Sequence, residues 1–301
     1  MTDKMTNIRF VFFGTAPLAR GVLDALESSG SLPSLIVAGP DSINARKKTV
    51  VFPPEKIWAL ERGITVVQPA KIDTQFIQTL TSEVWDIFVV ASYGKILPLE
   101  VLKIPKHGVL NMHPSLLPRL RGPSPIRCAI LTDECETGVS IILLDQEMDH
   151  GPIIAQKRVP IPQWSHPPKL GGGGPPRGRE LDELLAREGG ALLASYAIKW
   201  VRGEVSSHKQ NHDLATYCDF IKKEDGQLDL SSDAYQNLLK IRAYDGWPGT
   251  FAYFHRAGTR VRVKILDAHL EGSALVLDRV IPEGKREMSH EEFLRSGAVP
   301  A

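Results

Sequence analysis

Short apolar runs, most of them bounded by Gly or Pro, alternate with segments of helical spacing over the first 115 residues. The apolar runs fall at residues 8–14, 34–39, 64–69, 86–94 and 108–113, and the helical segments fall at 18–30, 53–63 and 73–84. Continuous apolar runs are typical of strands that are buried on both faces of a parallel sheet. This alternation predicts an α/β fold with a Rossmann-like, mostly parallel sheet and flanking helices.

The middle of the chain continues this pattern and then interrupts it. A further strand is predicted at 137–145, and the Gly- and Pro-rich stretch at 169–178 is typical of a loop. Residues 179–203 carry an amphipathic helix, which the pair Gly189 and Gly190 could interrupt.

Beyond about residue 205 the pattern becomes that of strands and turns. Strands are predicted at residues 249–254, 259–270 and 273–281. We therefore expect one domain over residues 1–205 and a smaller, β-rich C-terminal domain over residues 206–301.

Composition is that of an ordinary globular protein. Hydrophobic residues make up 43% and charged residues 24% of the 301 residues, and the formal net charge is +1. No overall electrostatic field would attract a nucleic acid or a membrane, so contacts with a polyanion must come from local patches.

The three Cys residues form no C-x-x-C pair, as expected of reduced thiols in the cytoplasm. No apolar run approaches the roughly 18 residues of a membrane helix, and the N-terminal residues do not have the pattern of a signal peptide.

Hydrogen-bonding residues crowd the end of the last predicted parallel strand, in the stretch NMHPSLLPRLRG at 111–122. Asn111 and His113 are two positions apart, so both side chains lie on the same face of the strand. Ligands of such sheets bind beyond the carboxyl ends of the strands. An amide donor beside an imidazole suits a reaction in which an oxygen becomes negative, as in acyl transfer. The alternative is a strand end at which both side chains only satisfy nearby backbone groups.

A second candidate is the acidic stretch DQEMDHGPII at 145–154, which lies between two apolar segments. A half-buried carboxylate there could hold a His in its charged form and accept a proton from a nucleophile. Asp149 is favoured because a Gly and a Pro follow it closely, as in tightly shaped loops. Gln146 and Glu147 are better explained as part of a solvated, charged turn.

Two common classes of site are disfavoured. The stretch FFGTAPLA has a single Gly and matches neither G-x-G-x-x-G nor a Walker loop, which argues against a dinucleotide or nucleoside triphosphate site. His208 and His212 lack the neighbours of a metal site and are better explained as a surface pair.

Two basic features could contact phosphates. The stretch NARKK at 44–48 lies in the loop after the second predicted strand, and Arg260, Arg262 and Lys264 form a stripe along one face of a later strand. Acidic and basic residues are nearly balanced over 208–301, so both features could equally be ordinary solvated charges.

The stretches NMHPSLLPRLRGPSPI, TGVSI and MDHGPII together resemble the formyltransferases that use 10-formyltetrahydrofolate, and Asp149 follows His113 at the spacing of that family. The resemblance extends to IRFVFFGTAPLA and VVASYGKILP and covers nearly the whole chain. It implies that Asn111, His113 and Asp149 are the catalytic residues and that no metal takes part. It also implies a set of folate contacts, which comprises Gly94, Ile96, Leu97, Ser115, Leu116, Leu117 and Pro118.

The stretch IRAYDGWPGTFAYF at 241–254 resembles the start of the C-terminal domain in members of the family that formylate methionyl-tRNA. The resemblance therefore implies a catalytic, folate-binding domain over 1–205 and an OB-like, tRNA-binding barrel over 206–301. Initiator methionyl-tRNA is the expected acceptor and 10-formyltetrahydrofolate the expected cosubstrate of a cytoplasmic monomer without membrane contact. The expected tRNA contacts are Arg46, Lys47 and Lys48 in the basic loop and Arg260, Arg262 and Lys264 in the basic strand.

In the expected reaction, Asn111 donates to the oxygen that becomes negative, His113 stabilises it and can pass a proton to the departing nitrogen, and Asp149 helps to remove a proton from the amine. Three alternatives stay open. A sugar-nucleotide N-formyltransferase or a formyltetrahydrofolate hydrolase would use the same three residues with a small acceptor or with water. A non-catalytic folate- or RNA-binding module would not need them.

Overall fold

The computed structural model describes residues 8–15, 17–44, 48–134, 136–161 and 174–301. The chain folds into two compact units, each built from several segments. The first comprises Met1–Pro123, Glu136–Pro160 and Asp182–Tyr217, and the second comprises Ser124–Cys135, Ile161–Leu181 and Cys218–Ala301. The functional division that we expect at residue 205 stays a prediction.

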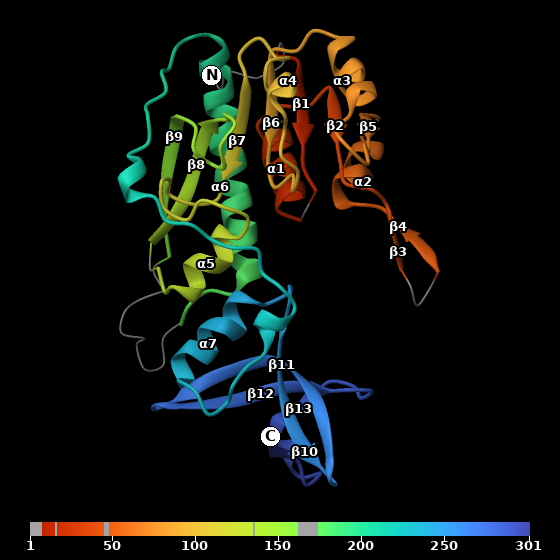
Figure 1. The fold of residues 1–301 in the computed structure, drawn as a ribbon, viewed down its shortest axis with the longest axis vertical. Coiled ribbons are helices and arrows are strands. Elements are labelled where there is room, and N and C mark those ends of the chain that lie inside the picture. The colour runs from red at the N-terminus through yellow and green to blue at the C-terminus, as the bar shows by residue number, and fades with distance from the viewer. Residues whose placement is uncertain (1–7, 16, 45–47, 135, 162–173) are drawn as a thin grey trace. The chain divides into compact units, whose positions relative to one another are not determined.

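The first unit is built on a seven-stranded sheet with the order β5-β2-β1-β6-β7-β8-β9, which Figure 1 shows from right to left. Its strands are β1 (Phe10–Phe13), β2 (Leu35–Val37), β5 (Thr65–Val67), β6 (Ile87–Val90), β7 (Val109–His113), β8 (Glu136–Leu143) and β9 (Ile153–Pro160). The strands from β5 to β7 are parallel, and β8 runs antiparallel to both of its neighbours. The mostly parallel α/β sheet expected from the sequence is confirmed.

Helices cover both faces of this sheet because its central strands are apolar on both sides. The helices are α1 (Pro17–Ser28), α2 (Pro54–Leu60), α3 (Thr74–Thr81), α4 (Leu99–Leu102) and α6 (Gly178–Val201). On one face, α1 and α6 pack so closely that a Cβ on Gly21 would lie 2.7 Å from the side chain of Ala186. On the other face, Phe76 of α3 and Val101 of α4 share a buried core with Phe13 of β1.

The helix expected over residues 179–203 is confirmed as α6, and it runs through Gly189 and Gly190 without the break that the sequence left open. Both glycines are points of close approach. A Cβ on Gly189 would lie 2.6 Å from the sulfur of Met112 in β7, and a Cβ on Gly190 would lie 2.5 Å from that of Ala25 in α1. Tertiary packing therefore outweighs the poor helix propensity of glycine at these two positions.

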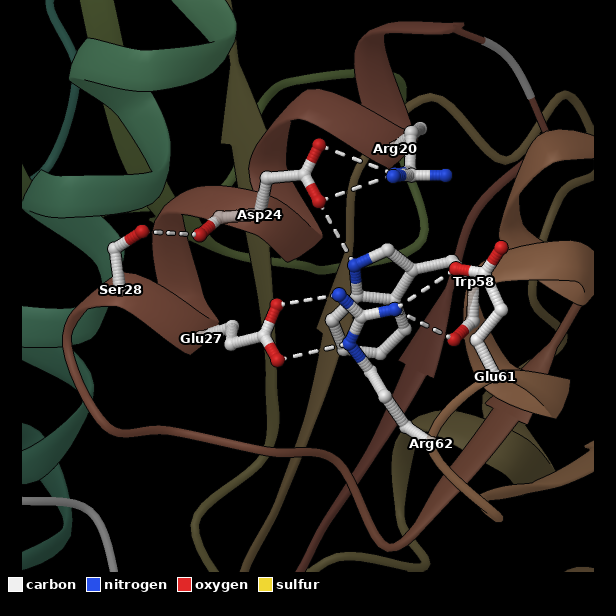
Figure 2. Close-up of polar contacts among 7 residues, drawn as sticks. All are labelled: Arg20, Asp24, Glu27, Ser28, Trp58, Glu61 and Arg62. Carbon is white, nitrogen blue, oxygen red and sulfur yellow. Dashed lines mark hydrogen bonds and ion pairs between the residues drawn. The ribbon is translucent and has the colours of Figure 1, made fainter.

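Polar side chains fasten α2 to α1, as Figure 2 shows. Arg62 makes two hydrogen bonds of 2.8 Å to the carboxylate of Glu27, and its guanidinium lies 4.2 Å from the centre of the Trp58 ring. These hydrogen bonds lower the pKa of Glu27 below its usual value. The buried indole of Trp58 donates to Asp24 at 2.8 Å. A forked ion pair stacked on an aromatic ring fixes the spacing and the angle of the two helices.

Two predicted loops behave differently from each other. The sequence predicted a loop after β2, but a hairpin of β3 (Ser42–Asn44) and β4 (Thr49–Val51) lies there and projects from the sheet in Figure 1. Arg46 and Lys47 lie outside the described residues, as do residues 169–173 of the Gly-rich stretch, whereas Lys48 is described and exposed. Residues 174–177 form neither helix nor strand, as expected.

The second unit contains a five-stranded antiparallel sheet with the order β13-β12-β11-β10-β14. Its strands are β10 (Thr250–Arg256), β11 (Thr259–Glu271), β12 (Ala274–Pro282), β13 (Met288–Ser289) and β14 (Val299–Pro300), and its helices include α5 (Pro125–Leu131), α7 (Ala234–Ala243) and α8 (His290–Leu294). Phe254 and Phe293 meet edge to face in its core, with ring centres 5.3 Å apart. The expected β-rich C-terminal domain is confirmed, and within the described residues its edge strands β13 and β14 do not pair with each other.

Across the described part of the chain, no helix combines the length and the apolar character that crossing a membrane requires.

Candidate active site

The carboxyl end of β7 carries the two polar side chains that the sequence marks as chemical groups. Asn111 and His113 lie on one face of the strand and expose only 8% and 4% of their surface. Met112, between them, faces Gly189 of α6. The alternation along β7 therefore turns both polar side chains away from α6, to the face where the loop before β9 approaches.

Asp149 enters the same site from the loop between β8 and β9. Its Oδ1 lies 3.4 Å from Nδ2 of Asn111 and 3.5 Å from Nδ1 of His113. Its Oδ2 accepts a hydrogen bond of 2.8 Å from the backbone N–H of Gly122. The carboxylate side chain is 12% exposed, so the three groups meet just beneath the surface. The structure thus brings together the three residues that the sequence proposes as catalytic.

The far side of the His113 ring sets its orientation. Its Nε2 lies 2.9 Å from the carbonyl oxygen of Leu120, and a carbonyl can only accept, so Nε2 carries a proton. The nitrogen that faces Asp149 is therefore Nδ1, and it is the one that can gain or lose a proton. With both nitrogens protonated, the ring forms an ion pair with Asp149.

The loop that carries Asp149 is tightly shaped. The backbone of Asp149 is left-handed, with φ at +51°, a conformation that Asp adopts more readily than most residues. A Cβ on Gly151 would lie 1.8 Å from the carbonyl oxygen of Leu143, so only glycine fits at that position. Gln146 and Glu147 are exposed on the outer part of the loop, as expected of a solvated turn.

The loop after β6 contains the first group of expected folate contacts. Gly94 is exposed, Ile96 exposes 81% of its surface, and Leu97 is buried in the core. The ring of Tyr93 packs edge to face on Phe13 with centres 5.3 Å apart, and burial raises the pKa of Tyr93 to about 12. The buried hydroxyl of Tyr93 has no hydrogen-bond partner among the described residues. This loop therefore combines an exposed apolar side chain, that of Ile96, with a buried aromatic ring, that of Tyr93.

The segment after β7 contains the second group, and most of it faces inward. Ser115 and Leu117 expose 1% and 3% of their surface, while Leu116 and Pro118 are half-buried. The hydroxyl of Ser115 donates to the carbonyl of Arg119 at 2.7 Å, which closes a turn. Because these side chains face inward, they hold the loop in shape. The groups that the loop can offer to a ligand are therefore mainly those of its backbone.

Two buried side chains beside Asp149 are absent from our sequence predictions. Arg121 and Gln210 expose 2% and 5% of their surface, and Gln210 donates to the backbone carbonyl of Asp149 at 2.8 Å. Arg121 stands beside Gly122 in the stretch that carries the family resemblance, so a signal for it was present. Gln210 lies in none of the motifs, and only the fold brings it to the site.

The basic strand of the C-terminal region is β11. Its side chains Arg260, Arg262 and Lys264 are exposed, as predicted. The guanidiniums of Arg260 and Arg262 lie 3.8 Å from the ring centres of Tyr253 and Phe251 on the neighbouring strand β10. These cation–π pairs hold the two guanidiniums in place on the exposed face of the sheet.

His208 and His212 are both exposed, and His212 stacks on His150 with ring centres 4.0 Å apart. In the described ranges, no three side chains of His, Cys, Asp or Glu are gathered in a way that could hold a metal ion.

The fold occurs in several solved structures. The N-formyltransferase of Helicobacter canadensis, solved with folinic acid and dTDP-3-aminofucose, is 19% identical, with a TM-score of 0.62 and coverage of 88% of each chain. HypX from Aquifex aeolicus, solved with tetrahydrofolic acid, is 16% identical, with a TM-score of 0.62 over 96% of this chain and 47% of that chain. At these identities the likeness concerns the fold alone.

Sequence comparison goes further. The formyl transferase family matches residues 7–168, and the family of its C-terminal domain matches residues 220–274. The methionyl-tRNA formyltransferase of Chloroflexus aurantiacus is 38% identical over 267 residues, which cover 88% of this chain and 82% of the relative. That of Myxococcus xanthus is 34% identical over 310 residues, which cover 97% and 96%.

The α/β sheet, its polar carboxyl edge and these matches define an enzyme that transfers a formyl group. The chain belongs to the formyl transferase family.

Proposed function

We propose that this protein transfers the formyl group of 10-formyltetrahydrofolate to the free amino group of initiator methionyl-tRNA, for the initiation of translation. Relatives named methionyl-tRNA formyltransferase match most of the chain at 38% and 34% identity. The chemistry is supported by one observation, the convergence of Asn111 and His113 on Oδ1 of Asp149. A neutral donor, a proton carrier and a carboxylate are the groups that this transfer requires.

The folate supplies a formyl group that is already activated on its N10 nitrogen. In the transfer, the amine nitrogen forms a bond to the formyl carbon, the bond from that carbon to N10 breaks, and one proton passes from the amine to N10. Asn111 contributes an N–H of its amide to the formyl oxygen as that oxygen becomes negative. Its Nδ2 carries two N–H groups, and the contact with Asp149 uses only one of them.

His113 and Asp149 handle the proton. Asp149 accepts it from the attacking amine, because its carboxylate is held at the site by Gly122 and is 12% exposed. His113 keeps its Nε2 proton on Leu120 and uses Nδ1 to hold the proton that goes to N10. The protonated ring also stabilises the negative oxygen.

The proposed folate site lies along the carboxyl ends of β6 and β7. The exposed side chain of Ile96 offers an apolar cover for a flat ring, and the neighbouring backbone offers hydrogen-bonding groups. The residues proposed to line this site are Gly94, Ile96, Leu97, Ser115, Leu116, Leu117 and Pro118.

The proposed tRNA contacts are the basic loop of Arg46, Lys47 and Lys48 and the stripe of Arg260, Arg262 and Lys264. The stripe is supported by its exposure and by the cation–π pairs that hold Arg260 and Arg262 in place, because guanidiniums held at a surface suit the phosphates of a nucleic acid. We further propose that residues 1–205 carry catalysis, that residues 206–301 bind tRNA, and that the enzyme is a cytoplasmic monomer.

A competition between acceptors tests the proposal. The enzyme would receive 10-formyltetrahydrofolate together with initiator methionyl-tRNA, with a nucleotide-linked amino sugar, or with no acceptor. We expect formylated methionyl-tRNA in the first reaction and no product in the other two. Formylation of the sugar alone would identify a sugar-nucleotide N-formyltransferase, and release of formate without an acceptor would identify a hydrolase. Either result would replace the proposed function.

A further inference from the structure

A segment near the end of the first unit reaches across to the active-site loops. We call residues 208–217 the strap. At one end, His208 pairs with Ile153 at the start of β9 through backbone hydrogen bonds of 2.8 and 2.9 Å. At the other end, the backbone of Arg121 donates to the carbonyl of Thr216 at 2.8 Å, and that of Leu120 donates to the Thr216 hydroxyl at 2.8 Å. The strap therefore joins the loop after β7 to the loop before β9.

The strap belongs to neither of the regions that the two family comparisons match, which end at residue 168 and begin at residue 220. Its buried side chain is Gln210, which exposes 5% of its surface. The Gln210 amide nitrogen donates to the backbone carbonyls of Asp149 and Gly151, both at 2.8 Å. The first of these carbonyls belongs to the left-handed residue Asp149 itself, and the second lies two residues further along the same loop.

Arg121 fixes which way the Gln210 amide points. Its Nε and Nη2 both donate to the Gln210 amide oxygen, at 3.2 and 2.7 Å. A guanidinium can only donate, so the oxygen must face Arg121, and the nitrogen must face the two carbonyls. Arg121 exposes 2% of its surface, and within the described ranges its side chain bonds to Gln210, His212 and Tyr217 and to no carboxylate. Two of its three other N–H groups go to His212 at 2.8 Å and to the Tyr217 hydroxyl at 3.3 Å.

We propose that Gln210 and Arg121 are positioning residues for the transfer step, which they serve by holding the carboxylate of Asp149 against Asn111 and His113. The inference rests on the proposed role of Asp149 in catalysis. Neither residue needs to touch a substrate, because the chain of contacts runs from Arg121 through Gln210 to the Asp149 backbone. A displacement of a catalytic group by about 1 Å can cost roughly 100-fold in rate.

The test replaces the amide with a carboxylate of the same shape. In Gln210→Glu, the side chain still accepts from Arg121 but no longer donates to the two carbonyls, and it brings a negative charge against them. We expect kcat to fall roughly 10–100-fold while the KM values for folate and acceptor stay unchanged. Asn211→Asp is the matched control, since it makes the same chemical change at the next residue, which is exposed and contacts the backbone of Asp213. Equal kcat losses in both variants would overturn the proposal, as would an unchanged kcat in Gln210→Glu.

A double-mutant cycle separates positioning from a general effect on folding. If Gln210 acts through the carboxylate, Gln210→Glu should add no further loss of kcat in an Asp149→Asn background, measured in single turnover. Additive losses would overturn the proposal. If Gln210→Glu does not fold, Arg121→Lys replaces it in the same cycle. This variant keeps the positive charge but lacks the planar set of N–H donors that holds the Gln210 amide.

The quantity compared is the kcat of the variant divided by the kcat of the wild type. It can be measured with whichever acceptor the wild type formylates. A wild type that does not formylate methionyl-tRNA would therefore overturn the proposed acceptor, while the ratio would still judge the role of Gln210.

Discussion

Replacing Asn111 with Ala should separate catalysis from folding more cleanly than any other change at the site. Among the described residues, the side chain of Asn111 makes one hydrogen bond, which it donates to Asp149, and its length of 3.4 Å exceeds the usual N–H···O range of about 2.7–3.2 Å. The carboxylate keeps its 2.8 Å hydrogen bond from Gly122 when Asn111 is removed. We therefore expect the free energy of unfolding to change by no more than about 1 kcal/mol.

The same substitution should destabilise the transition state of the reaction by a larger amount. The Asn111 N–H is the neutral donor available to the formyl oxygen, and loss of one such donor typically costs about 2.7–4 kcal/mol, or roughly 10²–10³ in kcat. The assay is steady-state formylation of methionyl-tRNA at saturating substrates, with urea unfolding measured in parallel. The loss should appear in kcat, because the donor acts only when the oxygen becomes negative.

A buried asparagine elsewhere supplies the control. Asn237 in α7 exposes 4% of its surface and donates from Nδ2 to the carbonyl of Asp229 at 2.8 Å. Asn237→Ala should lower the free energy of unfolding by about 1–2 kcal/mol, since it leaves a buried acceptor unsatisfied, and should leave kcat unchanged. If Asn111→Ala keeps a kcat within about tenfold of the wild type, Asn111 is not the oxyanion donor.

Three further results are expected. Gly151→Ala should lose most of its activity, because the added methyl would lie 1.8 Å from the Leu143 carbonyl and would displace Asp149, whereas Gly174→Ala, with open space around it, should be neutral in the same kcat assay. The double variant Arg260→Gln and Arg262→Gln should raise KM for tRNA and leave KM for folate unchanged. It should also reduce the slope of log KM for tRNA against log salt by about 0.7–0.9 for each phosphate that the two arginines neutralise. Arg295→Gln, which replaces an exposed arginine that follows α8 and pairs with Glu291, should change neither KM. Burial lowers the pKa of His290 below its usual value of 6.5, so the unfolded chain takes up a proton first as pH falls through that value, and stability should decline on the acid side. His290→Gln should flatten that decline in urea unfolding from about pH 7.5 to about pH 5.5, and an unchanged slope would contradict the assignment.

The sequence predicts what depends on local periodicity. Asn111 and His113 share a face of β7 because strand side chains alternate, and that much needs no knowledge of the fold. The exposed basic stripe on β11 follows from the same rule. Apolar runs that end in polar residues also locate the carboxyl edge of the sheet, where such proteins place their ligands.

What the sequence does not predict depends on contacts between distant segments. The family resemblance points to Asp149, but its approach to Asn111 and His113 depends on a left-handed turn and a hydrogen bond from Gly122, and no periodicity encodes either. Gln210 is one polar residue in an irregular segment, and it acquires a role only because the strap crosses the loop before β9. The hairpin of β3 and β4 is too short to leave a clear pattern of alternation.

The paired glycines of α6 have a practical meaning for anyone who wants a more robust enzyme. Changing a helical glycine to alanine is a routine route to higher melting temperature, worth up to about 1 kcal/mol at a solvent-facing position. At Gly190 the added methyl would lie 3.0 Å from the backbone carbonyl of Val22, and at Gly189 it would press on the strand that carries Asn111 and His113. Consensus-style stabilisation of this helix should therefore begin at its exposed positions and leave these two alone.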